Sequence, residues 1–347
     1  MKKSNKKALL AIRLSALGDV AMTIPVLLAF RRKNPDTQLI FITKKQFSPL
    51  LERIPNLRVV PFHSKGAHRG LRGLWRLRKQ LRQESLGAVA DLHAVLRTKI
   101  LKIFFSVSGI PYRVIDKGRS EKRRLTSWKT KEFRQLRSTH ERYADVFRNL
   151  GFQISLTESD ILPSEEWPET LLEKPVGPVL GVAPFAAHGG KCYPEEDMKK
   201  VLEMLAEVPG IRVYLFGGGS GETEVLRSWE REYPHCSSVA GKMTLSEELA
   251  VISNLDLMLS MDSGNGHLAA MYGIPVITVW GVTHPYAGFA PFLQPEENSI
   301  TANREQFPLI PTSVYGNKVP EGYGEVMRTI PPERIYRGIL QVLNKSY

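Results

Sequence analysis

Two stretches of the sequence place an acidic residue at the point where a strand pattern passes into a helix pattern. In the later stretch, an apolar run over 257–261 ends at Asp262, and a helical pattern begins after Ser263 and Gly264. His267 lies inside that helical pattern. The free N–H groups and the dipole of a helix N-terminus attract anions, typically phosphates. The stretch therefore indicates a phosphate site, with a plain helix cap at Asp262 and an ordinary helical His267 as the alternative.

The second acidic turn lies in the segment LLAIRLSALGD, residues 9–19. Four apolar residues lead into Arg13 and Ser15, and Gly18 and Asp19 then open a helical pattern. Arg13 interrupts the apolar stretch too early for a secretory signal, so the segment is interpreted as the first strand of a cytoplasmic protein. Two similar turns in one chain favour a functional interpretation of both.

Two glycine-rich turns follow strand patterns in the second half of the chain. APFAAHGGKCYP, residues 183–194, places Lys191 after two glycines, but it lacks the first glycine and the Ser or Thr of a P-loop. FGGGSGETE, residues 216–224, suits the close approach of a ribose or phosphate, with Glu222 or Glu224 available to sugar hydroxyls. Its spacing does not support a nicotinamide cofactor. An ordinary loop is an equal alternative for each turn.

Length and composition set the broad class. A chain of 347 residues with 42% hydrophobic residues predicts two well-buried α/β domains. Its two cysteines, Cys192 and Cys236, form no metal-binding or disulfide pattern. No AspXaaAsp pair occurs, so we expect no metal-held diphosphate. We also expect no metal site and no cofactor. No apolar run approaches the roughly 18–20 residues that a membrane span needs, so we expect a soluble or peripherally attached protein.

Charge is distributed unevenly along the chain. Residues 1–150 contain 34 Lys and Arg against 10 Asp and Glu, whereas the whole chain contains 48 against 35. The excess concentrates in 65–82 and 117–142, where aromatic residues lie among the basic ones. A solvated helix face, a nucleic-acid surface, and a surface for anionic lipid or phosphorylated sugar are the three interpretations. The size of the excess favours an anionic partner for the N-terminal half.

The apolar patterns predict alternating strands and helices on both sides of a linker near 158–178, which is rich in Glu, Pro and Ser. Such alternation predicts two doubly wound parallel sheets facing a cleft. The predicted domains are 1–165 and 166–330, followed by a helix in 331–347 that closes the second domain or crosses back to the first. The predicted strands are 9–13, 39–43, 58–61, 88–91, 113–115, 179–183, 212–216, 257–260 and 276–279, and the predicted helices include 71–84, 98–106 and 332–343.

Three motifs resemble those of glycosyltransferase family 9, the bacterial heptosyltransferases of lipopolysaccharide synthesis, and the resemblance extends over nearly the full chain. SALGDVAMTIP resembles the opening motif of the family, MDSGNGHLAA its D-[ST]-G-x-x-H-[LI] signature, and GKCYPEE its lysine followed by an aromatic residue and proline. The chain departs from the family pattern at Ala16, Ala186, Ala187 and Tyr193. The first three replace polar residues near the substrates, and Tyr193 replaces a common Trp.

The resemblance implies a GT-B fold, with a nucleotide-sugar-binding second domain and an acceptor-binding first domain. It implies a metal-independent, inverting transfer from a donor such as ADP-heptose to a lipopolysaccharide core or lipid A-type acceptor at the anionic inner face of the inner membrane of a Gram-negative bacterium. Asp19 is then the general base. The implied donor-binding residues are Lys191, Glu222, Met243, Asp262, Ser263, Gly264 and His267, and the implied acceptor-binding residues are Arg13, Ser15, Gly18 and His140.

Two other functions compete with the transferase. A polyanion- or RNA-binding protein would account for the basic half, with Trp75 and Trp128 available to stack on bases. No RNA-binding motif accompanies them, and a binding module leaves the two acidic turns unexplained, so we expect no nucleic-acid partner. A sugar-nucleotide epimerase would use the same fold and consume a nucleotide sugar without any acceptor.

Overall fold

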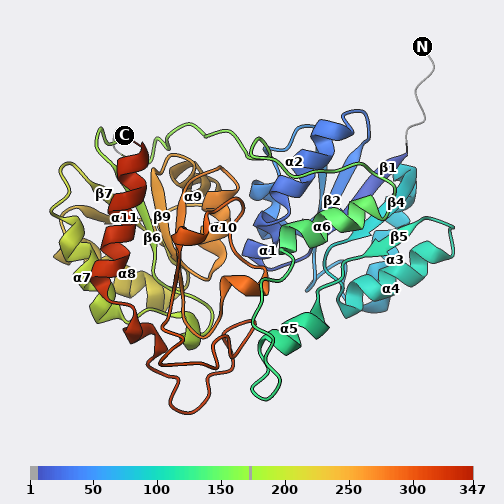
Figure 1. The fold of residues 1–347 in the computed structure, drawn as a ribbon. Coiled ribbons are helices and arrows are strands. Elements are labelled where there is room, and N and C mark those ends of the chain that lie inside the picture. Colours follow the sequence, from blue (N-terminus) through green and yellow to red (C-terminus); the bar gives the residue numbers. More distant parts are fainter. Residues whose placement is uncertain (1–6, 172–173, 347) are drawn as a thin grey trace. The chain divides into compact units, whose positions relative to one another are not determined.

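The computed structural model describes residues 7–171 and 174–346, which form two compact units, each built around one parallel sheet (Figure 1). The first unit contains the described residues up to Lys117 together with 139–162. The second contains 118–138 and the described residues from Pro163 onward. Among the helices of the described ranges, none combines the length and apolar character that crossing a membrane requires.

The sheet of the first unit has the strand order β3-β2-β1-β4-β5, with every pair parallel. β1 is apolar and fully buried, and β2 is buried at every residue except Lys44, as expected where helices cover both faces of a parallel sheet. The strands are β1 (Ala8–Ile12), β2 (Leu39–Lys44), β3 (Leu57–Phe62), β4 (Leu86–Asp91) and β5 (Tyr112–Val114). The helices are α1 (Leu17–Ala21), α2 (Ile24–Lys33), α3 (Gly70–Leu81), α4 (Leu96–Ser106) and α6 (Thr139–Arg148), with 3₁₀ turns Lys45–Leu50 and Arg82–Glu84.

Helices of the first unit pack in pairs. α3 lies against α4, and α2 lies against α6. The α2–α6 contact includes Phe30, whose ring centroid is 5.4 Å from that of Phe147. Because α6 follows an excursion of the chain through 118–138, the first unit is assembled from two separate pieces of sequence.

The sheet of the second unit has the order β11-β10-β9-β6-β7-β8 and is also parallel throughout. The chain adds β7 and β8 on one side of β6 and then returns to place β9 on its other side, so the order in which strands are added along the sheet reverses between β6 and β9. Its strands are β6 (Val179–Ala183), β7 (Arg212–Leu215), β8 (Cys236–Ser238), β9 (Leu257–Met261), β10 (Val276–Trp280) and β11 (Ser299–Thr301). Its helices are α5 (Arg119–Leu125), α7 (Glu195–Leu205), α8 (Ser220–Glu232), α9 (Leu245–Ile252), α10 (Gly264–Ala270) and α11 (Pro332–Ser346), with 3₁₀ turns Gly189–Lys191, Pro285–Ala287, Glu296–Asn298 and Val326–Thr329.

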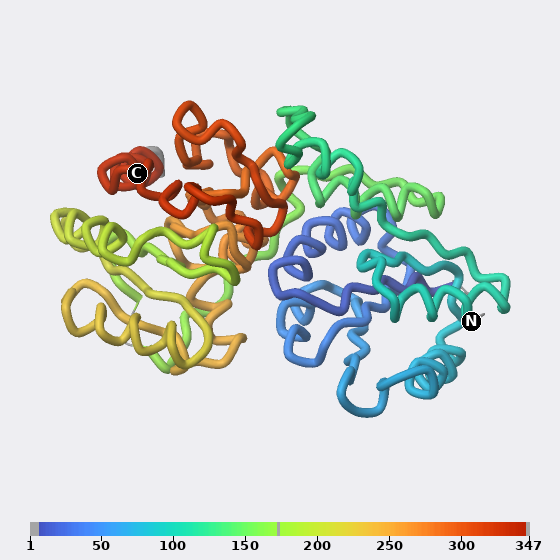
Figure 2. The backbone as a smooth tube through the Cα atoms, turned by 90° about the horizontal axis from the view of Figure 1, so that it is seen from below, coloured from blue at the N-terminus to red at the C-terminus, as the bar shows by residue number. Residues whose placement is uncertain are grey.

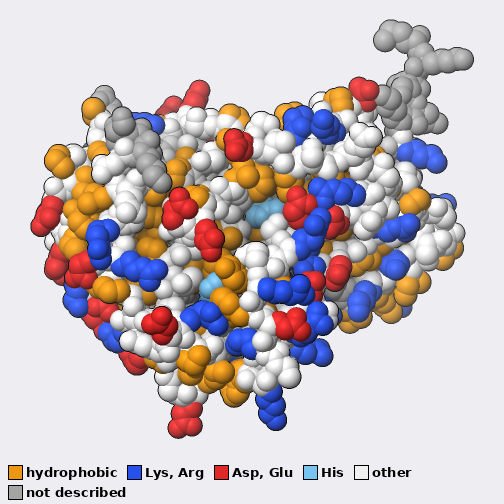
Figure 3. Space-filling model, viewed as in Figure 1, with side chains coloured by type: hydrophobic (Ala, Val, Ile, Leu, Met, Phe, Trp, Pro, Cys, Tyr) orange, Lys and Arg blue, Asp and Glu red, His pale blue; other side chains and the backbone are white. Residues whose placement is uncertain are grey.

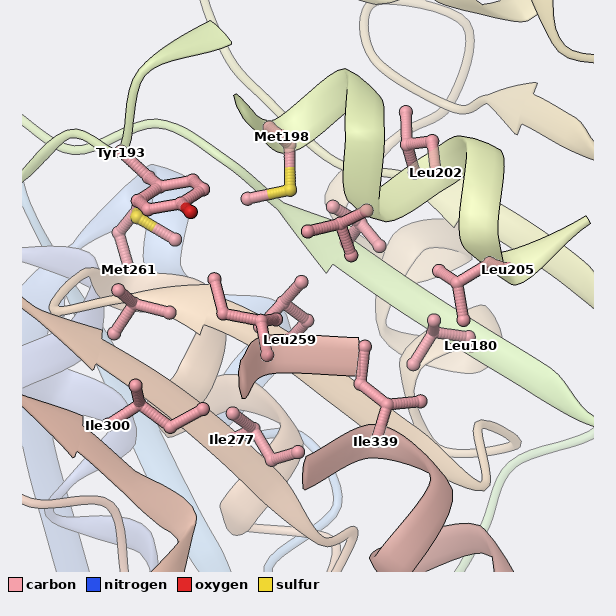
Figure 4. Close-up of a cluster of buried hydrophobic side chains, with 14 of the residues drawn as sticks. Leu180, Tyr193, Met198, Leu202, Leu205, Leu259, Met261, Ile277, Ile300 and Ile339 are labelled. Carbon is pink, nitrogen blue, oxygen red and sulfur yellow. The ribbon is translucent and has the colours of Figure 1, made fainter. Parts of the chain in front are cut away.

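The core of the second unit lies between the sheet and the helices α7 and α11. Leu180, Leu259 and Ile277 from the strands contact Leu202 of α7 and Ile339 of α11 (Figure 4). All five side chains are fully buried. The C-terminal helix therefore packs within the second unit, against α7 and β9.

Residues 118–138, predicted with the N-terminal domain, belong to the second compact unit. The segment is anchored by few apolar contacts: Leu125 and Leu136 are buried against Ala287. The Leu136 N–H donates to the Tyr286 carbonyl at 2.9 Å. Figure 2 shows this segment beside the loops of the C-terminal third of the chain. Because these anchors are scattered among basic residues, the sequence pattern does not reveal them.

The basic residues of this segment are therefore carried by the second unit. Figure 3 shows Lys and Arg side chains over both units on the face drawn. The excess of basic over acidic residues therefore differs less between the two folded units than between the two halves of the sequence.

All the predicted strands and helices are present, with small differences at their ends. The short edge strands β8 and β11 were not predicted. The predicted linker falls on irregular chain, and its residues 172–173 lie outside the described residues.

Candidate functional site

Asp19 and Arg13 form an ion pair at the carboxyl edge of the first sheet. Arg13 follows β1 and Asp19 lies in α1. Arg13 Nη1 also donates to the Leu92 carbonyl at 2.9 Å. Asp19 Oδ2 accepts a second hydrogen bond from the Ala16 N–H at 3.1 Å. The Arg13 side chain is 8% exposed and that of Asp19 is 30% exposed. Both of these contacts use Oδ2 of the Asp19 carboxylate, whose side chain is partly exposed.

Helix α6 supports this ion pair. The Tyr143 ring is fully buried and lies 5.9 Å from the Arg13 guanidinium carbon. The Tyr143 hydroxyl donates to the Asp19 carbonyl at 3.4 Å. His140, expected to bind phosphates, is buried one turn earlier on α6. Ser15 lies half-buried in the turn between β1 and α1, and Gly18 lies half-buried in the first turn of α1.

His93 belongs to the same cluster, and the sequence analysis missed it. Strand β4 pairs with β1 so that Ile12 lies opposite Asp91, which brings the residues after both strands to one edge. The Leu14 N–H donates to His93 Nδ1 at 3.3 Å. Burial lowers the pKa of His93 to about 3, assisted by the charges of Arg13, Lys117 and Lys44 and opposed by that of Asp19. His93 is therefore neutral at physiological pH. The signal that could have revealed it is a histidine two residues past a strand that ends in aspartate.

A basic pocket of about 820 Å³ lies elsewhere in the first unit, after β2 and β3. Its lining includes Lys44, Lys45, Lys65 and His63 and contains no carboxylate residue. Such a concentration of one charge favours an anionic ligand. Lys65 belongs to the predicted basic segment 65–82.

Lys191 and Asp262 meet at the carboxyl edge of the second sheet. Lys191 follows β6 and Asp262 follows β9, and these strands pair with Ala183 opposite Ser260. Lys191 Nζ lies 2.9 Å from Asp262 Oδ2, with side chains 14% and 9% exposed. Between β6 and β9 the order in which strands are added along the sheet reverses. In open α/β sheets, ligands bind at such a reversal point.

A loop that the sequence analysis did not identify packs against Lys191. Gly316 has φ +81°, and a Cβ atom there would lie 2.4 Å from Lys191 Cγ. Hydrogen bonds to Ser313 Oγ from the N–H groups of Gly316 and Tyr315 define the turn. The lysine stem therefore lies directly over a residue that must be glycine.

Helix α10 begins immediately after Asp262. Ser263 is its N-cap, and Ser263 Oγ lies 3.1 Å from Ser260 Oγ. The first N–H groups of a helix, here from Gly264 onward, have no acceptor within the helix. His267 lies half-buried on the same short helix. The predicted residues Asp262, Ser263, Gly264 and His267 are thus brought together with Lys191.

Glu222 and Met243 follow the next two strands. Glu222 lies in the first turn of α8, and its Oε2 accepts the Gly218 N–H at 2.7 Å, which closes the glycine-rich turn. Met243 precedes α9, whose start is fixed by a capping box between Thr244 and Glu247. Both residues are partly exposed.

The residues of the second unit that are expected to bind the donor substrate, here called donor-type residues, form an ordered row. Along the sheet, Asp262 follows β9, Lys191 follows β6, Glu222 follows β7 and Met243 follows β8. The row passes from the Lys191–Asp262 ion pair to the Glu222 carboxylate and then to the apolar side chain of Met243. In residues 7–171 and 174–346, no three His, Cys, Asp or Glu side chains are placed to hold a metal ion.

The two parallel-sheet α/β units, each with polar residues at its carboxyl edge, match solved glycosyltransferases of the GT-B fold. A glycosyltransferase family 9 structure from Veillonella parvula matches with a TM-score of 0.75 and 18% identity, covering 99% of both chains. The structure of E. coli heptosyltransferase WaaC with ADP matches with a TM-score of 0.69 and 18% identity, covering 96% of this chain and 99% of that one.

The chain belongs to glycosyltransferase family 9 (heptosyltransferase), whose family model matches residues 74–319. The lipopolysaccharide core heptosyltransferase OpsX of Haemophilus influenzae is 26% identical over 296 residues, which cover 80% of each chain. The predicted family and fold class are confirmed, and the protein is a glycosyltransferase. The epimerase and the polyanion binder are therefore not the favoured functions.

Proposed function

We propose that this glycosyltransferase transfers a heptose from ADP-heptose to a lipopolysaccharide core or lipid A-type acceptor, with inversion and without a metal ion. Its relatives include a lipopolysaccharide core heptosyltransferase, and a similar fold is recorded with bound ADP. The enzyme works at the inner face of the inner membrane of a Gram-negative bacterium, in peripheral contact with anionic lipid.

The row of residues along the second sheet is the observation that carries this proposal. A nucleotide sugar presents its diphosphate, ribose and base in the same order as the side chains after β9 and β6, β7 and β8. Lys191 and the start of α10 suit the diphosphate, Glu222 suits the ribose hydroxyls, and Met243 suits the flat base. Glu222 Oε2 is occupied by the Gly218 N–H, so the ribose is bound through Oε1.

The leaving diphosphate is stabilised by the protein rather than by a metal ion. When the bond between the anomeric carbon and the phosphate oxygen breaks, negative charge develops on the diphosphate. Lys191 and the N–H groups at the start of α10 are fixed before the reaction, so they stabilise that charge without reorganising.

Asp19 is the general base. Its Oδ1 accepts the proton of the acceptor hydroxyl while the hydroxyl oxygen attacks the anomeric carbon. A single displacement of this kind inverts the configuration of the sugar. Arg13 and the Ala16 N–H hold the carboxylate from its other oxygen. His93, which accepts the Leu14 N–H, is neutral and therefore adds no charge beside the Arg13–Asp19 pair.

The donor is tested by thermal unfolding of the purified protein against a panel of nucleoside diphosphates and nucleotide sugars. ADP and ADP-heptose should raise Tm, because a ligand that binds only the folded state stabilises it. Transfer to a lipid A-type acceptor should then persist in excess chelator. If another nucleotide series alone stabilises the protein, or chelator abolishes transfer, the proposed donor or the metal independence is wrong.

The acceptor is tested at the basic pocket of the first unit. Lys45 and Lys65 are exposed there, so Lys45→Gln/Lys65→Gln should raise KM for a phosphorylated acceptor about tenfold or more. ADP affinity should not change. Lys79→Gln, an exposed lysine on α3 of the same unit, is the matched control. An unchanged acceptor KM in the double variant would remove this pocket from acceptor binding.

Membrane contact is tested at α5. Arg119 and Arg123 are exposed on this helix. Each basic residue near an anionic membrane contributes about 1 kcal/mol, so Arg119→Glu/Arg123→Glu should weaken binding to phosphatidylglycerol-containing vesicles at least tenfold. Arg227→Glu/Arg231→Glu on α8 is the control for net charge. Equal binding of the two double variants would contradict a membrane role for α5.

A further inference from the structure

A second pocket in the second unit, of about 510 Å³, lies apart from the row of donor-type residues. Its lining includes His284, which follows β10, and Thr301 and Arg304, which end or follow β11. Phe133 of the segment 118–138 contributes another wall. The Lys191–Asp262 pair belongs to the neighbouring strands β6 and β9. The pocket is therefore a separate feature of the same sheet edge.

Arg304 supplies a fixed positive charge to this pocket. Its guanidinium carbon lies 3.3 Å from the centroid of the Phe133 ring, and its Nε donates to the Ile310 carbonyl at 2.9 Å. These contacts hold the guanidinium plane. Across the described ranges, no carboxylate lies within ion-pair distance of Arg304. Its two terminal nitrogens are therefore available to a ligand, and Arg334 adds a second cation at the exposed rim.

His284 supplies a neutral donor. Its side chain is only 6% exposed, and its Nδ1 accepts the Tyr286 N–H at 3.2 Å. A neutral imidazole that accepts at Nδ1 carries its proton on Nε2. Burial lowers the pKa of His284 to about 4, assisted by the charges of Arg304 and Lys131, so the ring stays neutral. For this Nε2–H the described residues provide no acceptor, which leaves the donor to the pocket.

The rest of the lining suits a polyol rather than a bare anion. Glu296 and Glu305 are exposed at the rim, and Asn303, whose Oδ1 accepts the Glu305 N–H, also lines the pocket. Carboxylates accept hydrogen bonds from hydroxyl groups, and an amide can both accept from them and donate to them. The ring of Tyr286 lies 4.9 Å from that of Phe133 and offers an apolar surface. A cationic end beside a hydroxyl-binding rim indicates a ligand with both kinds of group.

We propose that this pocket binds a carbohydrate unit that carries a phosphate or a carboxylate group. Arg304 and the His284 Nε2–H bind the anionic group, and the rim residues bind the hydroxyls. Charge-assisted hydrogen bonds to a guanidinium supply most of the affinity. The proposal concerns a site distinct from the donor site, and it does not depend on which sugar the enzyme transfers.

The test is a titration followed on the ring signals of the histidines by NMR. The chain contains eight histidines, so the His284 signal can be assigned by its loss in His284→Asn. Saturating ADP occupies the donor site throughout. Glucose 6-phosphate and glucuronate, the two probes, should shift the His284 signal at millimolar concentration. Glucose should not shift it, and inorganic phosphate should bind at least about fivefold more weakly than glucose 6-phosphate.

Variants separate the site from general charge effects. Arg334→Gln should weaken glucose 6-phosphate binding several-fold, and Arg304→Gln about tenfold or more. His284→Asn keeps an acceptor for the Tyr286 N–H but removes the Nε2 donor, so calorimetry should also show weaker binding. Arg337→Gln, an exposed arginine on α11 outside the pocket, is the matched control. Retained ADP binding shows that each variant is folded.

Two results would overturn the proposal. The first is a His284 signal that no probe moves at concentrations up to about 50 mM, or that moves equally in Arg334→Gln and in Arg337→Gln. The second is inorganic phosphate binding as tightly as glucose 6-phosphate, which would contradict the carbohydrate part of the proposal.

Discussion

Lys191 and Asp262 pair through Nζ and Oδ2 at 2.9 Å, in a place where neither side chain is more than 14% exposed. The lysine charge is thus already balanced before any substrate binds. An incoming diphosphate gains less from Lys191 than it would from an unpaired lysine. The N–H groups at the start of α10 must therefore contribute a substantial share of its binding.

The first prediction concerns this ion pair. Lys191→Met should weaken ADP binding at least tenfold and also lower stability by about 3–5 kcal/mol, because it leaves the Asp262 charge buried without its partner. Adding Asp262→Asn should restore much of the stability without restoring ADP affinity. Thermal unfolding and calorimetry measure the two effects. Lys199→Met, which breaks an exposed pair with Glu232, should cost at most about 1 kcal/mol. A double variant no more stable than Lys191→Met would contradict this account.

The second prediction concerns the glycine beneath Lys191. Gly316→Ala should lower ADP affinity, because its Cβ would collide with the lysine stem at 2.4 Å and displace the ammonium group. Gly322→Ala is a matched control, since Gly322 has φ +79° and no heavy atom within 4 Å of the added Cβ. Both substitutions should cost about 1 kcal/mol of stability through backbone strain, and Gly316→Ala should cost more than Gly322→Ala because it also disturbs the Lys191–Asp262 pair. Only Gly316→Ala should change ADP binding, and equal affinities would show that the loop does not position Lys191.

The third prediction concerns the base. Asp19→Asn should lower the transfer rate by at least about 10²-fold, because an amide cannot accept the acceptor proton. ADP affinity should stay near that of the wild type, since Asp19 lies outside the donor-binding unit. Asp36→Asn, an exposed carboxylate after α2, is the control. Transfer by Asp19→Asn at the rate of Asp36→Asn would exclude Asp19 from proton transfer.

The fourth prediction concerns the pH dependence of stability. In the folded protein the pKa of His93 is lowered to about 3, whereas an unfolded chain binds a proton near pH 6.5. The unfolded state therefore binds more protons between these values, so stability should fall as pH falls from about 6.5 towards 3. His93→Gln should reduce this slope by at most about 1.4 kcal/mol per pH unit. Urea unfolding at pH 5 and 7 measures it, and the exposed His188→Gln should leave the slope unchanged.

The sheets could be predicted because their central strands contain runs of contiguous apolar residues, as in 39–42 of β2 and Val179–Ala183. Strands β8 and β11 escaped prediction because each has three residues and includes hydroxyl side chains. A strand so short is defined by its neighbour in the sheet. The local sequence carries too little periodicity to reveal it.

The candidate site could be predicted only in part. The sequence indicates Asp19, Lys191 and Asp262 because each follows a strand pattern. It does not reveal that Lys191 pairs with Asp262, because such a contact depends on which strands are neighbours. His93 was missed for a related reason: its place beside Asp19 follows from the pairing of β4 with β1.

The interleaving of the two units has a consequence for synthesis on the ribosome. Residues 118–138 leave the ribosome before the loops on which they pack. Helix α6, which supports Asp19 through Tyr143, leaves the ribosome after residues 118–138. The first unit can complete its fold once residues up to 162 have left the exit tunnel. Residues 118–138 then lack their packing partners until the loop at Tyr286 has been translated. An N-terminal fragment ending at Lys117 would lack α6 and leave the α2 face uncovered, so such a truncation would not yield an intact first unit.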